Sequence, residues 1–275
     1  MNRRDFRVKV NYKETFMKKI ISILIVAIVL GISSAAMAEG PSVTIGLKTW
    51  IANWEQKLEL VVDEDTGETM KFSDKSDYGL MYGPVFNLRY EKFFGSLSYL
   101  IGGDFNFELS DLDYSDSTIG YSWDYDEKYD RTDLDIAIGY YFHPNISVFL
   151  GYKNVNIDLT ATITEEETIL LDLWKDGSIK ESGTIKGPAL GVSGNYPIGE
   201  TNWILFGSLS YLSLDGEWEG ESLGDYTGPS IEIGGAYVLE TMPLSITAGY
   251  KYQSLKADEV EDIFSGLTFG VNYTL

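Results

Sequence analysis

The chain of 275 residues contains no cysteine and a single histidine, His143. Without cysteine there is no disulfide framework, thiolate metal site or thiol nucleophile. His143 lies in the turn-like segment Phe142-His143-Pro144-Asn145, and no second imidazole exists to act as a base at neutral pH. The sequence also lacks a Gly-x-Ser-x-Gly motif and a phosphate-binding glycine loop. We therefore expect no catalytic residue, no resident cofactor and no enzymatic activity.

Basic residues are scarce. The chain has 21 Lys and Arg residues against 42 Asp and Glu residues. Residues 1–38 hold seven of the basic residues and two of the acidic ones, which leaves 14 basic and 40 acidic residues and a net charge of −26 for the remainder. Nucleic acid is excluded as a partner, because its phosphates require a basic surface.

Long apolar runs are also absent, apart from one near the N-terminus. Lys18-Lys19 precede an apolar run from Ile20 to Leu30, and Ala36-Met37-Ala38 follow it. This arrangement is typical of a secretory signal peptide, and the run is too short to span a bilayer comfortably. The predicted organisation is a start-site extension at 1–16, a signal peptide at 17–38 and a single exported domain at 39–275.

What the chain does contain is alternation. It has 28 Gly, 19 Tyr and 13 Phe residues, and in the last nine residues every odd position is apolar or aromatic. Such alternation predicts a β-strand with one apolar and one polar face. Ten segments show it: 43–51, 80–90, 93–107, 134–142, 146–152, 190–196, 203–211, 229–237, 244–252 and 267–275.

Charged residues are absent from the apolar face of these segments. Arg or Lys facing lipid at mid-membrane costs about 2–4 kcal/mol, so this segregation favours strands in a bilayer. If the strands close into a barrel, eight charged residues on the opposite face are predicted to point into its lumen: Lys48, Arg89, Asp104, Asp133, Asp135, Lys153, Glu232 and Lys251. They either pair with one another and plug the lumen, or line a narrow ion path.

The signal peptide and the alternation up to the last residue resemble those of Gram-negative outer-membrane β-barrels. That family usually ends in Phe or Trp, where this chain has Leu275. The resemblance implies an all-β fold, a transmembrane antiparallel up-and-down β-barrel, with ten strands expected and eight or twelve as alternatives. It also implies an outer-membrane location and contact with lipid and lipopolysaccharide. The barrel assembly machinery would recognise the outward residues of the last strand: Leu267, Phe269, Val271, Tyr273 and Leu275.

The connections between the segments alternate between short and long. Four are short: around 91–92, 143–145, 197–201 and 239–243. Five are long: 55–79, 109–130, 160–186, 215–226 and 255–263. Barrels of this class keep short periplasmic turns and longer extracellular loops, so both ends of the domain should face the periplasm. Turn signals at Asp65-Thr66-Gly67 and Asp176-Gly177 predict that two long loops are β-hairpins.

The loop at 109–130 is strongly acidic. Closely spaced carboxylates suit Ca²⁺ or Mg²⁺, although their spacing matches no full calcium motif, and the alternative is that they only keep the loop solvated. The candidate cation ligands are Asp111, Asp113, Asp116, Asp124 and Asp126.

The leading functional hypothesis is a non-enzymatic surface barrel with a structural, adhesive or ligand-binding role through these acidic loops. The alternatives are a small passive pore and, third, an outer-membrane enzyme.

Overall fold

The computed structural model describes residues 41–63, 68–109, 114–116, 119–121, 123–165, 177–258 and 260–275. The predicted start-site extension and signal peptide lie outside the described residues. No helix in the described part of the chain is long and apolar enough to span a membrane.

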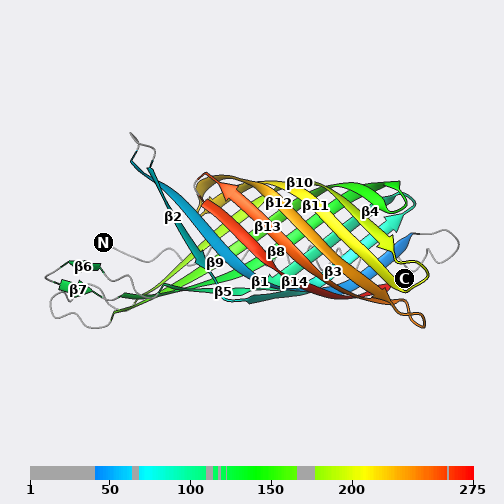
Figure 1. Ribbon diagram of the computed structural model, residues 1–275, viewed down its shortest axis with the longest axis horizontal. Coiled ribbons are helices and arrows are strands. Elements are labelled where there is room, and N and C mark those ends of the chain that lie inside the picture. The colour runs from blue at the N-terminus through cyan, green and yellow to red at the C-terminus, as the bar shows by residue number, and fades with distance from the viewer. Residues whose placement is uncertain are drawn as a thin grey trace, which may run out of the picture. The chain divides into compact units, whose positions relative to one another are not determined.

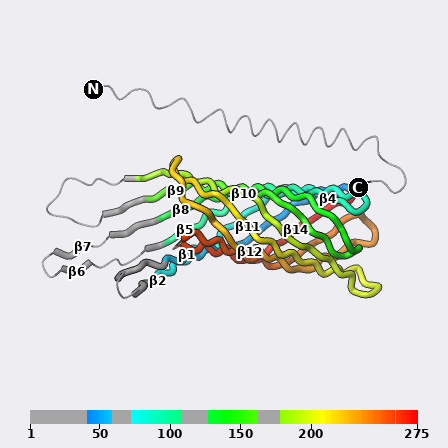
Figure 2. The backbone as a smooth tube through the Cα atoms, turned by 90° about the horizontal axis from the view of Figure 1, so that it is seen from above, coloured from blue at the N-terminus to red at the C-terminus, as the bar shows by residue number. Residues whose placement is uncertain are grey.

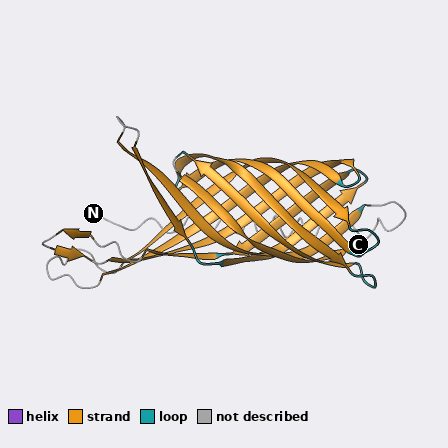
Figure 3. Ribbon diagram, in the orientation of Figure 1, coloured by secondary structure: helices purple, strands orange, loops and turns teal. Residues whose placement is uncertain are grey.

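The described residues are almost entirely β-strand (Figure 3). The strands are β1 (Ser42–Asp63), β2 (Glu68–Lys75), β3 (Gly79–Tyr90), β4 (Phe93–Gly102), β5 (Asp104–Leu109), β6 (Tyr114–Asp116), β7 (Ile119–Tyr121), β8 (Trp123–His143), β9 (Ile146–Glu165), β10 (Gly177–Pro197), β11 (Trp203–Trp218), β12 (Glu221–Val238), β13 (Leu244–Ala257) and β14 (Val260–Thr274).

Ten of these strands close into an antiparallel barrel (Figure 1). Their order is β1, β3, β4, β8, β9, β10, β11, β12, β13 and β14, and β14 pairs back with β1. Leu47 lies opposite Val271 and Ile51 opposite Leu267 at this seam. The predicted ten-strand up-and-down barrel is confirmed.

The two ends of the barrel differ. The C-terminus and the short turns, such as the one between β8 and β9, lie at one end, which we call the turn end (Figure 2). At the opposite, extended end, β2 pairs with the outer part of β1, and β5 prolongs β4 along β8. The expectation of long loops at 215–226 and 255–263 is wrong. Strands β11 and β12 run on to a tight turn at Glu219-Gly220, and β13 and β14 leave only residues 258 and 259 between them.

A band of apolar side chains covers the outside of the barrel from the turn end. Leu47 is 66% exposed and Ile138 is 64% exposed, which would be costly in water and is favourable in lipid. Tyr90, Tyr196 and Tyr237 are exposed close to the turn end, where aromatic rings commonly meet the membrane surface.

Toward the extended end the apolar side chains change sides. On β9, Val148 and Leu150 face outward, whereas Val155 and Ile157 face inward and are buried. No bulge interrupts the register of β9 with β10 at this point. The strand therefore continues regularly, and it is the apolar residues that move from its outward to its inward face. The outer surface therefore passes from lipid-compatible to water-compatible partway along each long strand.

The inward apolar residues fill the extended half of the barrel with a continuous core. Trp54 is its centre, with ring centroids 4.9 Å from Tyr129 and Phe264 and 5.4 Å from Phe107. The Tyr129 and Phe107 rings pack edge-to-face against it, which stabilises beyond the area buried, and the Phe264 ring is tilted by 33°. Further members are Met81, Leu100, Phe105, Val155, Ile157, Leu159, Ile185, Leu212, Leu214, Tyr226 and Leu255.

Three Gly-Pro pairs bring neighbouring strands close together at this core. A Cβ atom on Gly83, Gly187 or Gly228 would lie 1.8, 2.3 or 2.1 Å from a carbonyl oxygen of the adjacent strand. Each glycine is followed by proline, which has no N–H to give to the ladder. The glycines leave room for the inward leucines of the adjacent strands, which are Leu100, Leu214 and Leu255.

Candidate functional site

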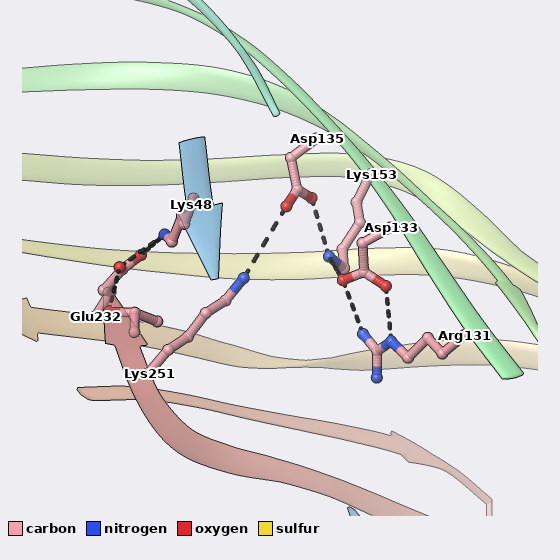
Figure 4. Close-up of polar contacts among 8 residues, drawn as sticks. Lys48, Arg131, Asp133, Asp135, Lys153, Glu232 and Lys251 are labelled. Atoms are coloured by element: carbon pink, nitrogen blue, oxygen red, sulfur yellow. Dashed lines mark hydrogen bonds and ion pairs between the residues drawn. The ribbon is translucent and has the colours of Figure 1, made fainter. Parts of the chain in front are cut away.

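A layer of charged side chains crosses the lumen between the apolar core and the turn end. Figure 4 shows the contacts within it. We call it the charged layer. Its members are Lys48, Arg131, Asp133, Asp135, Lys153, Glu232 and Lys251.

Asp133 is the most completely bonded member. Its carboxylate has no exposed surface and accepts two hydrogen bonds from the Arg131 guanidinium, at 2.6 and 3.0 Å. Lys153 Nζ donates a third at 2.7 Å. Charge-assisted bonds of this geometry are among the strongest in proteins, and they offset the cost of burying the charges.

Asp135 lies one inward position further along β8 and links two lysines. Lys153 Nζ donates to Asp135 Oδ1 at 2.9 Å, and Lys251 Nζ lies 4.0 Å from Asp135 Oδ2. Lys251 also lies 4.5 Å from the centre of the Trp50 ring, a favourable cation–π arrangement. Lys251 is therefore held by electrostatic attraction without a short hydrogen bond.

Lys48 and Glu232 form a separate pair on the other side of the layer (Figure 4). Lys48 Nζ donates to both carboxylate oxygens of Glu232, at 2.7 and 2.8 Å, and the Thr268 hydroxyl donates at 3.1 Å. This pair joins β1 to β12 across 184 positions of sequence.

The prediction that Asp104 faces the lumen is wrong. Gly102 and Gly103 have φ values of 86° and 101°, and the register with β8 shifts by one residue between Leu100↔Asp133 and Asp104↔Asp130. The resulting bulge turns Asp104 outward, where it is 59% exposed and pairs with Lys128 at 3.1 Å.

Two further residues refine the predicted network. Arg89 faces inward but lies near the turn end, where its guanidinium stacks 4.4 Å from the centre of the Tyr141 ring, away from the charged layer. Arg131 belongs to the layer and was missed, because the predicted strand began at residue 134. Extending the parity of Asp133 and Asp135 back by one inward position would have identified it.

Polar cavities lie at the charged layer and on its turn-end side, and the first also reaches Leu100, Leu212 and Gln253 on the side of the core. One has a volume of about 310 Å³ and is lined by Lys48, Asp135, Glu232, Lys251 and Gln253 among others. A second, of about 420 Å³, shares Lys48 and Glu232 with it and continues toward Tyr141 and Asn272 near the turn end. The lumen is therefore polar and hollow on one side of the layer and apolar and filled on the other.

On the apolar side, Asp262 is buried among the aromatic rings. Trp54 Nε1 donates to Asp262 Oδ1 at 2.8 Å. Of the outward residues of β14 around it, Glu261 and Ser265 are polar, and Ile263 between them is buried and not part of the exposed apolar surface, so this position lies beyond the apolar band. Burial raises the pKa of the Asp262 carboxyl to about 6, and the Trp54 hydrogen bond only partly opposes this rise.

Comparison with solved structures identifies the type of barrel. The outer-membrane protease OmpT from Escherichia coli superposes with a TM-score of 0.58 at 13% identity, over 85% of this chain and 97% of that one. The chain therefore has the fold of an outer-membrane β-barrel. At this identity the likeness shows the fold alone.

Other outer-membrane barrels superpose less well on this one. The toluene transporter TodX from Pseudomonas putida gives a TM-score of 0.32 at 10% identity, over 86% of this chain and 90% of that one. Ail, the attachment invasion locus protein of Yersinia pestis, gives 0.30 at 11% identity, over 85% and 98%. No protein-family model matches the sequence, and no curated protein matches it.

His143 lies at one end of β8, and the candidate cation ligands Asp124 and Asp126 lie near the other. His143 ends β8 at the turn end, is exposed, and accepts a hydrogen bond at 3.3 Å from the Asn145 backbone N–H. Of the candidate cation ligands, Asp111 and Asp113 lie outside the described residues. Only the backbone is described for the others, which are Asp116 in β6 and Asp124 and Asp126 in β8. Elsewhere in the described chain, no cluster of three His, Cys, Asp or Glu side chains could hold a metal ion.

Proposed function

We propose that this barrel is inserted in the outer membrane as a closed, non-conducting wall, and that it acts through the strands and loops of its extended end. The observation that carries the proposal is the filled extended half of the lumen. Trp50, Met81, Phe105 and Leu214 are at most 1% exposed there, although each faces the inside of a barrel. A ten-strand lumen is narrow enough for side chains to close it.

The charged layer supports the same reading. Its three carboxylates are held between four cations by contacts of 2.6–4.0 Å. An ion crossing the layer would have to break buried, hydrogen-bonded pairs, and each break costs several kcal/mol. Beyond the layer the ion would then meet mostly aromatic and aliphatic side chains, which offer no ligands to replace its water, and the one buried carboxylate there, Asp262, already accepts a hydrogen bond from Trp54.

A role in binding or adhesion at the cell surface follows from the extended end. By the rule that such barrels keep short turns in the periplasm, this end faces outward. Its partners would be lipopolysaccharide and other surface molecules, while the outward residues of β14 meet lipid and the assembly machinery.

The acidic segment at 111–126 would bind Ca²⁺ or Mg²⁺ between its carboxylates and lipopolysaccharide phosphates. Protease digestion with Ca²⁺ or with chelator tests this, since Ca²⁺ should protect the segment and replacing Asp111, Asp113 and Asp116 by Asn should weaken that protection.

An enzymatic role is not part of the proposal. OmpT is a protease, but the likeness at 13% identity extends to the fold alone. The one histidine of the present chain lies on an exposed turn at the end opposite to the extended strands. Incubating the purified barrel with unstructured peptides tests this point directly, and their cleavage would contradict it.

Planar-bilayer recording tests the closed lumen. We expect no steady unitary current from the purified, folded protein. The positive control is the double variant Trp54→Ala, Phe264→Ala, which removes two rings from the centre of the core and should produce conducting events. A steady ohmic current from the unaltered protein would instead establish the alternative, a small passive pore that opens through the polar cavities.

A further inference from the structure

The polar cavity beside the charged layer has the features of a binding site. One wall is formed by inward residues of three adjacent strands, β11, β12 and β13. Ser210, Ser230 and Gln253 lie opposite one another in one row of this wall, and Ser208, Glu232 and Lys251 in the next. All six line the cavity of about 310 Å³, and Leu100, Ala189 and Leu212 add apolar surface.

Gln253 is the first sign that something is bound there. Its side chain is 1% exposed, and neither its amide nitrogen nor its amide oxygen has a hydrogen-bond partner among the described residues. Buried polar groups without partners each cost about 1–3 kcal/mol, so a protein rarely keeps both ends of an amide unbonded. An amide aimed into a cavity is satisfied when the cavity is filled by a polar molecule.

Lys251 is the second sign, and it rests on separate contacts. Arg131 and Lys153 are bonded to Asp133 and Asp135, and Lys48 is bonded to Glu232. Lys251 is the fourth cation of a layer with three carboxylates, and its nearest acidic oxygen is 4.0 Å away. Asp262, the next buried acid, is engaged with the Trp54 indole beyond the layer. The Lys251 ammonium therefore has hydrogen bonds to give and a positive charge that is only partly compensated.

We propose that this cavity binds a small organic monocarboxylate that enters from the turn end. Its carboxylate would accept hydrogen bonds from Lys251 Nζ and Gln253 Nε2, and its apolar part would lie against Leu100, Ala189 and Leu212. A single negative charge matches the single surplus cation. A phosphate dianion would place excess negative charge beside Glu232 and Asp135, which is unfavourable in a buried site.

The entrance is the second cavity, of about 420 Å³, which shares Lys48, Asn87, Ser193, Ser208 and Glu232 with the first and reaches toward the turn end. The apolar core closes the far side, so the ligand would enter and leave by the same route. The site is small for a ligand pocket, near the lower end of the range of about 300–1,000 Å³, and suits a molecule of a few carbon atoms.

Titration calorimetry on the folded protein in detergent tests the site, with butyrate and benzoate as probes and butyramide and phosphate as comparisons. Detergent removes any dependence on conductance, so the result is independent of the closed-lumen proposal. We expect at least one of the two carboxylates to bind with a dissociation constant in the millimolar range or tighter, and butyramide and phosphate to bind more weakly.

The variant Lys251→Met keeps the length of the side chain and removes the ammonium. Asp135 retains Lys153, so the variant should still fold, which heat-dependent gel mobility checks. We expect it to weaken carboxylate binding at least about tenfold, as the loss of one charge-assisted hydrogen bond predicts. Gln253→Leu should weaken binding without any change of charge. The matched control is Lys256→Met, an exposed position of the same strand, which should bind as the parent does.

Three results would overturn the proposal: no binding of butyrate or benzoate by the parent protein, equal binding by Lys251→Met and the parent, or binding of phosphate at least as tight as that of the carboxylates. If Lys251→Met fails to fold, Gln253→Leu decides alone, and unchanged binding by that variant would count against the site.

Discussion

Replacing Asp133 by Asn isolates the contribution of the charged layer to stability. The substitution keeps the shape of the side chain but removes a fully buried negative charge and directs an amide group at a cation. Arg131 loses its partner at 2.6 and 3.0 Å, and Lys153 loses its contact at 2.7 Å. Removing one partner from a buried ion pair costs about 3–5 kcal/mol, because the remaining charges stay buried without compensation. We expect a loss of that size in the free energy of unfolding.

Asp135→Asn is the matched comparison. Asp135 is 36% exposed at its side chain, and its contacts are a bond of 2.9 Å to Lys153 and a distance of 4.0 Å to Lys251. Water from the polar cavity can solvate what this variant leaves behind, so the loss should be nearer about 1 kcal/mol. The difference between the two variants measures burial, since both remove one carboxylate from the same strand.

Equilibrium unfolding in urea from lipid vesicles, followed by tryptophan fluorescence, gives both values. The double variant Arg131→Met, Asp133→Asn should cost less than the sum of its two single changes, because the second substitution removes a charge that the first has stranded. The reasoning fails if Asp133→Asn costs no more than Asp135→Asn, or if the double variant is fully additive.

Three further predictions use the same unfolding assay. Ile138→Arg and Leu209→Arg, both on exposed outward positions, should each cost about 2–4 kcal/mol in vesicles, and tolerance of both would show that this face does not meet lipid. Gly187→Ala should cost about 1–3 kcal/mol, since its Cβ would lie 2.3 Å from a backbone oxygen, whereas Gly95→Ala, with 3.9 Å of room, should be nearly neutral. Burial raises the pKa of Asp262 to about 6 in the folded state, against 3.8 for the free group, so the folded state holds the proton more tightly. The free energy of unfolding should therefore fall by about 3 kcal/mol as pH rises from about 4 to 7. The variant Asp262→Asn should remove this dependence on pH.

The sequence was sufficient to predict the strands of the membrane band and the number of strands in the barrel. Period-2 alternation places Ile136 and Ile138 on one face and Asp133 and Asp135 on the other, and lipid outside with ion pairs inside requires that separation. The closing pair β1–β14 follows from the same pattern at the two ends of the domain.

The apolar core of the extended end could not be predicted, because the same period-2 alternation fits both an outward face toward lipid and an inward face toward a core. Val155 and Ile157 alternate with Asn154 and Asn156 as regularly as Val148 and Leu150 alternate with their neighbours. Only a change of phase, from even to odd apolar positions at Lys153, separates an outward lipid face from an inward core. From the sequence, the change of phase resembles the end of a strand, and the predicted segment therefore ends at residue 152, short of these core positions.

Asp104 was misplaced for a different reason. A bulge adds one residue to a strand and reverses the side on which every later side chain lies. The Gly102-Gly103 pair is a signal for such a bulge, but glycine is frequent throughout this chain and marks tight packing at Gly83, Gly187 and Gly228 without changing parity. Backbone geometry was needed to tell these two uses of glycine apart.

The change of phase along the strands also fixes how deeply the protein sits in its membrane. On β9, a shift toward the turn end by two residues would draw Asn154 into hydrocarbon, and a shift the other way would lift Tyr152 and Leu150 into water. Because the same boundary recurs around the barrel, both displacements are penalised on many strands at once. The sequence of the strands therefore fixes the level of the membrane–water interface on the barrel. A bilayer of different thickness would have to thicken or thin around the barrel to match this interface, because displacing or tilting the barrel would not lower the free energy.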